Sequence, residues 1–300
     1  MKLQRAIEEY LETKEDLKGY PTYKSALGAV EINPSLKGLN LAGDLRNSQR
    51  TERVVKTRKI FQEIETSLKD KSQNTKYYII NMVKFVFKYL EDNYGYILWK
   101  NYKIAQDKKD IVVLEPEFAK AFIMDSHNIY DGLKDNLKAV HELSSVMLTS
   151  SLRFIDALNI KSENLQGGKV VIKNQKTGIV TSCPLPEGLY IKLEQNLTKS
   201  GYPYSKEMSS DMYYELFEKL FCQYPELKKL VNGEPFYEQI RFHTFRKTAI
   251  TLMLYMKVPH SVVTMASGHT MGSKAFQRYV GFVEKMHDDY ISDFQSKFYS

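Results

Sequence analysis

The chain has 300 residues, of which 43% are hydrophobic and 26% are charged, as is usual for a globular protein of about two domains. Its two cysteines, Cys183 and Cys222, exclude a disulfide framework and lack the paired spacing of a zinc site. The first twenty residues are charged throughout, which excludes a secretory signal there. No apolar run approaches the ~18 residues that span a bilayer. We therefore expect a soluble, cytoplasmic protein without a membrane segment.

The net charge of +7 is distributed unevenly along the chain. Residues 1–110 carry 21 Lys and Arg against 15 Asp and Glu, whereas residues 111–300 carry 22 against 21. A basic half is typical of proteins that bind a polyanion such as nucleic acid. Many soluble proteins with a similar pI bind no nucleic acid, so charge alone does not decide the partner.

Residues 1–100 are predicted to form a helical N-terminal domain. An amphipathic helix is expected over residues 1–17 and a basic helix over about 50–68. Residues 20–50 contain prolines and several glycines and are expected to be irregular. The basic residues of the second helix either face solvent or contact phosphates; they are Lys56, Arg58 and Lys59.

A longer helix follows, and Ser72 or Asn74 can cap its N-terminus. Apolar residues recur along it three and four positions apart. We assign this stripe to the core of the domain rather than to a surface that stacks on bases. Its members are Tyr78, Met82, Phe85, Val86 and Tyr89.

A polar, charged segment over residues 101–112 is expected to link this domain to a second one over residues 113–300. Helices are predicted around residues 115–126 and 131–149, and another begins just before Arg153. β-Branched residues then flank a turn that contains Lys176, which predicts a hairpin. The fold class is therefore mainly α (α+β), with a small antiparallel sheet in the second domain.

A further helix is predicted to start at His243 and Arg246, with an apolar face formed by Phe245, Ala249, Leu252, Met253 and Met256. The helix macrodipole opposes an arginine at a helix N-terminus, whereas an anion there would be stabilised both by the dipole and by the guanidinium. This conflict indicates a phosphate ligand. The alternative is that Arg246 pairs with an acidic side chain.

Pro259 and Gly268 delimit another short helix, because proline is favoured at helix starts and glycine at helix ends. His269 follows directly, and Tyr279 lies ten residues further on. Each has an ordinary explanation when taken alone, since most histidines are structural and most tyrosines are packed aromatics. Arg153 likewise could form a simple helix-surface ion pair with Asp156.

Together these positions resemble the tyrosine recombinases, also called the phage-integrase family, because they occur in that family's order. The matching positions are Arg153, Lys176, His243-Thr244-Phe245-Arg246, Gly268-His269 and Tyr279. The resemblance covers roughly residues 113–283, and residues 45–100 are similar, more loosely, to the family's core-binding domain. Some positions depart from the pattern, and none of them removes a catalytic group. Serine replaces a common glycine at Ser151 and a common leucine at Ser267, Phe245 and Lys247 also differ, and the interval from His269 to Tyr279 is one residue longer than usual.

The resemblance implies a site-specific DNA recombinase or integrase of a mobile genetic element. Such an enzyme cleaves and rejoins double-stranded DNA through a 3′-phosphotyrosyl intermediate, here on Tyr279, without a metal, ATP or another cofactor. Two arginines would bind the phosphate, His243 would take the tyrosine proton, and Lys176 would protonate the departing 5′ oxygen. A clustered set of cations suits this chemistry, because it favours a phenolate and shields the anionic phosphodiester.

By the same resemblance, the two domains would clamp duplex DNA, and four protomers would assemble on paired sites. An amphipathic tail over about residues 282–300 would dock either on a neighbouring protomer or on its own domain. Two alternatives are a type IB topoisomerase and a non-catalytic DNA-binding protein that uses a helix-turn-helix. The second helix of such a motif, at residues 261–267, lacks the Arg, Lys, Asn or Gln that reads bases, which disfavours the last alternative.

Overall fold

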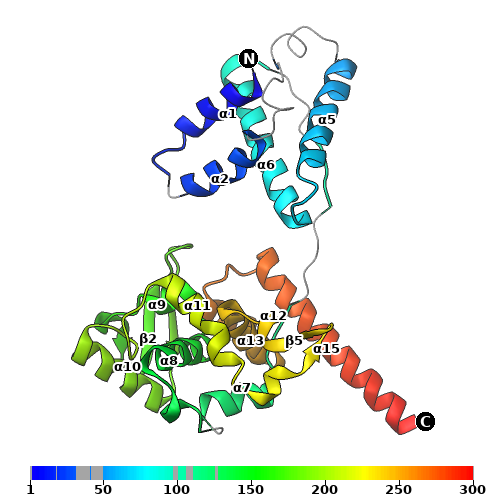
Figure 1. The fold of residues 1–300 in the computed structure, drawn as a ribbon. Coiled ribbons are helices and arrows are strands. Elements are labelled where there is room, and N and C mark those ends of the chain that lie inside the picture. Colours follow the sequence, from blue (N-terminus) through cyan, green and yellow to red (C-terminus); the bar gives the residue numbers. More distant parts are fainter. Residues whose placement is uncertain are drawn as a thin grey trace. The chain divides into compact units, whose positions relative to one another are not determined.

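The computed structural model divides the chain into two compact units, residues 1–109 and 110–300, and each is described by itself (Figure 1). The described residues are 2–17, 19–31, 41, 50–96, 101–105, 111–125 and 128–299, with backbone alone at 31, 50, 51 and 289–299. Part of the predicted irregular segment and part of the predicted linker therefore lie outside the described residues. Within the described residues, every helix is too short or too polar to cross a bilayer.

Unit 1 is helical, as predicted, and is drawn in blue to cyan in Figure 1. Its helices in the described part of the chain are α1 (Leu3–Glu12), α2 (Tyr20–Glu31), α5 (Arg50–Ser67) and α6 (Gln73–Tyr94). Both α1 and α2 pack against α6, and their apolar faces join one buried cluster. The side chain of Ser72 accepts a hydrogen bond from the Thr75 amide and caps α6, which confirms one of the two predicted caps.

Two predictions for unit 1 were wrong. Residues 20–31 form a helix rather than an irregular segment, because Pro21 lies in the first turn, where its missing amide proton is not needed. The buried stripe of α6 is also rotated from the predicted one, since Phe85 is 48% exposed and Tyr78 is exposed as well. Helices contact α6 from more than one side, so its buried face is broader and is centred elsewhere. The fully or nearly fully buried residues are Ile79, Ile80, Met82, Val83, Val86, Phe87 and Leu90.

Unit 2 contains the α-helices and the small sheet predicted for the second half of the chain. Its helices are α7 (Pro116–Ile123), α8 (Asp135–Ser150), α9 (Phe154–Leu158), α10 (Glu187–Ser200), α11 (Ser210–Phe221), α12 (Phe236–Gln239), α13 (Phe242–Tyr255), α14 (His260–Ser267) and α15 (Lys274–Tyr299). α8 is buried along most of its length between α11 and α13. Aromatic rings fill the space between these helices, with Phe122, Phe221 and Phe245 in mutual contact.

A three-stranded antiparallel sheet has the order β1 (Leu165–Gln166), β2 (Lys169–Lys173) and β3 (Val180–Pro184). β2 and β3 form the predicted hairpin, in which Ile172 pairs with Thr181. Side chains alternate between buried and exposed along both strands, and β3 packs against α14. A second, two-stranded sheet of β4 (Leu230–Val231) and β5 (Glu234–Pro235) was not predicted, since two residues are too few to show a period.

Two boundaries in unit 2 differ from the sequence predictions. α9 begins just after Arg153 rather than just before it, so Arg153 occupies the N-cap position with an extended backbone. Met256 was predicted on the apolar face of α13, but the helix ends at Tyr255 and Met256 is 75% exposed. The remainder of that face is buried or half-buried, as predicted.

Candidate functional site

Arg246 lies in the first turns of α13 and is almost fully buried, with 1% of its surface exposed. Its Nη1 donates to the carbonyl of Ser151 and its Nη2 to the carbonyl of Ser267 at 2.7 Å. These carbonyls close the C-terminal ends of α8 and α14, where the helix dipole is negative. In the described part of the chain, the partners of Arg246 are these main-chain carbonyls and not a carboxylate, so the alternative of an acidic partner is wrong. Burial, followed by the charge of Arg153, lowers the pKa of Arg246 to about 10, which leaves it protonated at neutral pH.

Arg153 is half-buried at the start of α9 and is tied to the hairpin. Its Nη1 donates to Oδ1 of Asn174 at 2.6 Å, and its Nη2 donates to the carbonyl of Gly268 at 3.3 Å. Asp156 lies 3.8 Å from Nη1, but its carboxylate is fully buried and also accepts the amide of Gln175 at 2.9 Å. The expected surface ion pair is thus part of a buried network that fixes the guanidinium.

Asn174 is a buried residue at the root of the hairpin turn, and sequence reasoning missed it. Besides accepting from Arg153, it donates from Nδ2 to the carbonyl of Ile179 at 2.8 Å, across the turn. Lys176 lies between these two residues and is exposed. A polar residue before a glycine-containing turn is visible in the sequence, but the inward direction of its side chain is not. Asn174 therefore links the phosphate-binding candidate Arg153 to the segment that carries Lys176.

Gly268 ends α14 in the left-handed conformation, with a φ of 63°. A Cβ placed there would lie 2.6 Å from Nδ2 of Asn174 and 3.0 Å from Cγ2 of Thr181, so the hairpin packs directly on this glycine. His269 follows, and its amide donates to the carbonyl of Thr264 at 3.2 Å. Nδ1 of His269 lies 2.9 Å from Oγ of Ser267. The close approach of helix and hairpin thus places His269 beside Arg153.

Tyr279 lies on α15 and is 7% exposed. Its ring belongs to an apolar cluster with Phe276 and Val283 and lies 5.8 Å from the ring of His269, measured between centroids. Burial raises the pKa of Tyr279, and the charges of Arg246, Arg278 and Arg153 oppose the increase. The hydroxyl is therefore protonated at neutral pH and must lose its proton if it is to attack an electrophile.

The two histidines are both neutral at neutral pH. Burial, and then the charges of Arg246 and Arg153, lower the pKa of His269 to about 4. The pKa of His243 is also lowered to about 4, by desolvation of its ring and by neighbouring cations that include Lys176. His243 keeps part of its surface exposed, so solvent moderates the contribution of desolvation. Closely spaced positive charges repel one another, and an anionic ligand bound between them would relieve this repulsion.

The structure thus brings the six predicted residues into one cluster. Arg153 and Arg246 both donate to carbonyls at the end of α14, directly before His269. The ring of His269 contacts the ring of Tyr279. His243 interacts electrostatically with both arginines and with Lys176. In the described part of the chain, no group of three or more His, Cys, Asp and Glu side chains could hold a metal ion. The cations of the cluster are Arg153, Lys176 and Arg246.

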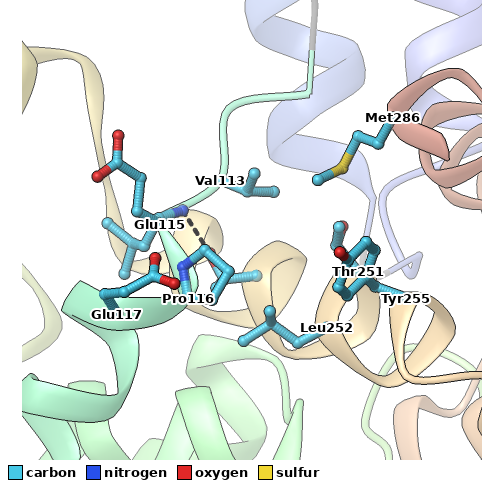
Figure 2. A pocket seen from close by; sticks show the side chains of 10 residues that line it. Val113, Glu115, Pro116, Glu117, Thr251, Leu252, Tyr255 and Met286 are labelled. Carbon is cyan, nitrogen blue, oxygen red and sulfur yellow. Dashed lines mark hydrogen bonds between the residues drawn. The ribbon is translucent and has the colours of Figure 1, made fainter. Parts of the chain in front are cut away.

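A separate pocket of about 290 Å³ lies where the segment before α7 meets α13 and α15. Figure 2 shows Met286 of α15 pointing into the space near Val113 and Thr251, with Leu252 and Tyr255 lining the pocket from α13. None of the six predicted residues lines it. The pocket is therefore distinct from the cationic cluster.

The family model described as the phage integrase family matches residues 123–284, more than half of the chain. The fold is similar to the Tn1549 transposon integrase in complex with transposon right-end DNA, with a TM-score of 0.66 and 13% identity over 94% of each chain. It is also similar to the lambda integrase (residues 75–356) bound to DNA, with a TM-score of 0.65 and 13% identity over 93% of this chain and 96% of that one. No curated protein sequence matches the chain.

These similarities agree with the order of the site residues along the sequence. At such low identity the structural similarities concern the fold alone. The residues matched by the family model include all six predicted positions, from Arg153 to Tyr279. The chain belongs to the phage integrase family and is a tyrosine-type site-specific DNA recombinase.

Proposed function

We propose that Tyr279 is the nucleophile that cleaves DNA and holds it as a 3′-phosphotyrosyl intermediate. The observation that carries this proposal is the convergence of Arg153, Arg246 and His269 around the end of α14, beside the ring of Tyr279. The phenol oxygen attacks the phosphorus, and the bond from phosphorus to the 5′ oxygen breaks. The energy of that bond is retained in the phosphotyrosyl link, so a 5′ hydroxyl of another strand can attack it without ATP.

The two arginines bind the non-bridging oxygens of the phosphate in this proposal. Each guanidinium has five N–H donors, and the bonds to carbonyls and to Asn174 leave others for a ligand. Because those bonds fix both groups before DNA binds, little reorganisation is needed when negative charge develops in the transition state.

The proton transfers fall to the histidines and to Lys176. The protonated Tyr279 needs a base, and a neutral imidazole of His243 or His269 can accept its proton. Lys176 is exposed on the turn between β2 and β3, so it can approach a bound strand and give a proton to the departing 5′ oxygen. No step of this scheme assigns a role to a metal ion.

We further propose that residues 1–100 are a core-binding domain and residues 113–300 a catalytic domain, joined by the linker over residues 101–112, and that both contact double-stranded DNA. Tn1549 integrase structures contain transposon-end or circular-intermediate DNA, and a lambda integrase tetramer is bound to a Holliday junction. By analogy, four copies of this chain assemble on paired sites in the cytoplasm. The tail at about residues 282–300 has its later side chains outside the described residues.

Covalent trapping on a nicked suicide substrate tests the catalytic proposal. The wild-type chain is expected to give a DNA adduct that resists denaturation, in the presence of EDTA as well as in its absence. Tyr279→Phe should abolish the adduct while DNA binding is retained, because the phenol oxygen is the attacking atom. Tyr214→Phe, a change to an exposed tyrosine on α11, is the matched control and should leave the adduct unchanged.

An adduct that persists in Tyr279→Phe, or that maps to another residue by peptide sequencing, would contradict the assignment. Absence of any adduct from the wild-type chain on a broad library of sites, with DNA binding intact, would instead support a protein that binds DNA without cleaving it.

A further inference from the structure

The turn between β2 and β3 has one buried side chain, that of Asn174, whereas residues 175–178 are exposed. The amide group of Asn174 forms hydrogen bonds on two sides. Oδ1 accepts from Nη1 of Arg153 at 2.6 Å, and Nδ2 donates to the carbonyl of Ile179 at 2.8 Å. A guanidinium can only donate and a carbonyl can only accept, so these partners determine which way the amide group points. Asn174 thereby connects the turn to the start of α9.

The main chain closes this turn without the side chain of Asn174. The amide of Asn174 donates to the carbonyl of Ile179 at 2.9 Å, and the amide of Gly178 donates to the carbonyl of Asn174 at 2.8 Å. Loss of the side chain would therefore leave the hairpin formed but remove its bond to Arg153. One hydrogen bond from the turn to α9 would remain, from the amide of Gln175 to the carboxylate of Asp156 at 2.9 Å. A turn held to α9 by one bond is less restrained than a turn held by two.

Arg153 depends on Asn174 less than the turn does. Its Nη2 also donates to the carbonyl of Gly268 at 3.3 Å, and Oδ2 of Asp156 lies 3.8 Å from its Nη1. That Oδ2 is buried and has no hydrogen-bond partner among the residues that the structure describes. It can accept from Nη1 if Asn174 is removed, so the guanidinium would keep two partners. Removal of the Asn174 side chain should therefore affect the turn more than the arginine.

Lys176 is exposed and lies two residues beyond Asn174. Its charge reaches the cationic cluster, since it is one of the cations that lower the pKa of His243. A lysine ammonium sits on a flexible four-carbon stem, so it can be held close to a reacting atom only if the main chain below it is fixed. The position of the Lys176 ammonium thus depends on the turn, and the position of the turn depends on Asn174.

We propose that Asn174 is a positioning residue that ties the turn carrying Lys176 to Arg153, so that the proton donor and a phosphate-binding group are held in one geometry. The inference rests on the proposed function, in which Lys176 protonates the departing 5′ oxygen. The Tyr279 oxygen bonds to phosphorus, the bond from phosphorus to the 5′ oxygen breaks, and a proton moves from Nζ of Lys176 to that oxygen. Because Arg153 binds the same phosphate, the tether keeps the donor near the bond that breaks.

Amide hydrogen exchange of the full-length protein without DNA, resolved by residue, tests the tether itself. Asn174→Ala should speed exchange of the Gln175 amide by about tenfold, the order expected for the loss of one hydrogen bond. The amide of Gly178 should change little, because its partner lies within the turn. Unchanged exchange at Gln175 would overturn the proposal. This measurement involves no cleavage, so it is independent of the roles of Tyr279 and Lys176.

Single-turnover cleavage of two suicide substrates gives the functional test. One has the ordinary phosphodiester, and the other has sulfur in place of the bridging 5′ oxygen. A thiol has a pKa of about 8.5, so the sulfur can leave as a thiolate and needs no proton from Lys176. Asn174→Ala should slow cleavage of the ordinary substrate by about tenfold and should cleave the sulfur substrate within about twofold of the wild-type rate. Equal slowing on both substrates would assign the effect to Arg153 or to the fold and would overturn the proposal, as would wild-type rates on both.

Asn164→Ala is the matched control. Nδ2 of Asn164 also donates to a main-chain carbonyl of the sheet, that of Val171 on β2 at 3.0 Å, but Asn164 does not contact the turn. This variant should match the wild type on both substrates and in the exchange of Gln175. Lys176→Ala should lose more activity than Asn174→Ala on the ordinary substrate and should also recover on the sulfur substrate. If Lys176→Ala is slow on both, Lys176 is not the proton donor and the proposed function fails at that step, while the exchange of Gln175 still decides whether Asn174 holds the turn.

Discussion

Ser151 ends α8 in the left-handed backbone conformation, with a φ of 55°. This conformation costs a residue with a side chain about 1–2 kcal/mol. The hydroxyl of Ser151 is buried and has no hydrogen-bond partner in the part of the chain that the structure describes. The carbonyl, by contrast, accepts a hydrogen bond from Arg246. Residue 151 therefore contributes to the site through its carbonyl and not through its side chain. A glycine, which is common at this position in the family, would supply the same carbonyl.

Ser151→Gly should stabilise the protein without loss of activity. Relief of the backbone strain and removal of the unpaired hydroxyl outweigh the extra freedom of glycine in the unfolded chain, so we expect the free energy of unfolding to rise by about 1 kcal/mol. Urea denaturation followed by circular dichroism measures this change. Ser150→Gly is the control: Ser150 is helical and bonded to the Val146 carbonyl, so its replacement should destabilise. Destabilisation by Ser151→Gly would refute the account of this position.

At the residue scale, the sequence predicted residues that the structure brings together but not how they are held. Residue type and order pointed to Arg153, His269 and Tyr279, because the proposed chemistry requires those groups. The partners of Arg246 are main-chain carbonyls at the ends of two helices distant in sequence, and any residue can supply a carbonyl. Asn174 likewise depends on a tertiary approach that leaves no periodic signal.

At the scale of elements, the site is formed where the hairpin of β2 and β3 packs on the end of α14. Gly268 permits this contact, since a Cβ there would lie 2.6 Å from Nδ2 of the buried Asn174. Asn174 cannot move away without losing its bonds to Arg153 and to the carbonyl of Ile179. A side chain at residue 268 would therefore separate the hairpin from the helix and displace Arg153.

Gly268→Ala should destabilise the protein by about 2–4 kcal/mol, the combined effect of left-handed backbone strain and overpacking. Gly272→Ala provides a matched control, because Gly272 also has a positive φ, of 77°, but a Cβ there would meet nothing within 4 Å among the described atoms. Gly272→Ala should lower the free energy of unfolding by only about 1 kcal/mol, because only the strain of the left-handed backbone contributes. Urea denaturation of both variants measures the difference, and equal losses would show that contact with the hairpin adds nothing.

Element positions were predicted best where a local signal was strong. The hairpin followed from two β-branched runs around a turn, and α14 from proline and glycine at its ends. The helix at Tyr20–Glu31 was not predicted, because proline usually interrupts a helix, although it is tolerated in a first turn. The buried face of α6 depends on which helices surround it, and that information is absent from the local pattern.

At the scale of the whole molecule, the two units differ in charge. Residues 1–109 contain 21 Lys and Arg against 14 Asp and Glu, whereas residues 110–300 contain 22 of each. Unit 1 therefore carries the entire net charge of +7, and the cationic cluster of unit 2 is balanced within its own unit. Long-range attraction to DNA is accordingly expected from unit 1, and the chemistry from unit 2.

Helix α5 is the part of unit 1 where this attraction can be tested. Arg58 and Lys59 are exposed, whereas the apolar side of the helix is buried, at Ile60, Phe61 and Ile64. Lys56 is less suitable because it forms an ion pair with Glu52 at 2.9 Å. Replacement of Arg58 and Lys59 by alanine removes two charges without touching the buried side of the helix.

If both residues contact phosphates, the slope of log affinity against log salt concentration should become shallower by about 0.9 per contact, or roughly 2 in all. Titration of labelled duplex DNA over a series of salt concentrations measures it. Lys199→Ala, at the exposed end of α10, is a control that should leave the slope unchanged. Because phosphate contacts carry no sequence information, binding to target and to unrelated duplex should weaken by the same factor. An unchanged slope would place α5 outside the DNA footprint, and a loss confined to the target duplex would indicate that these residues read bases.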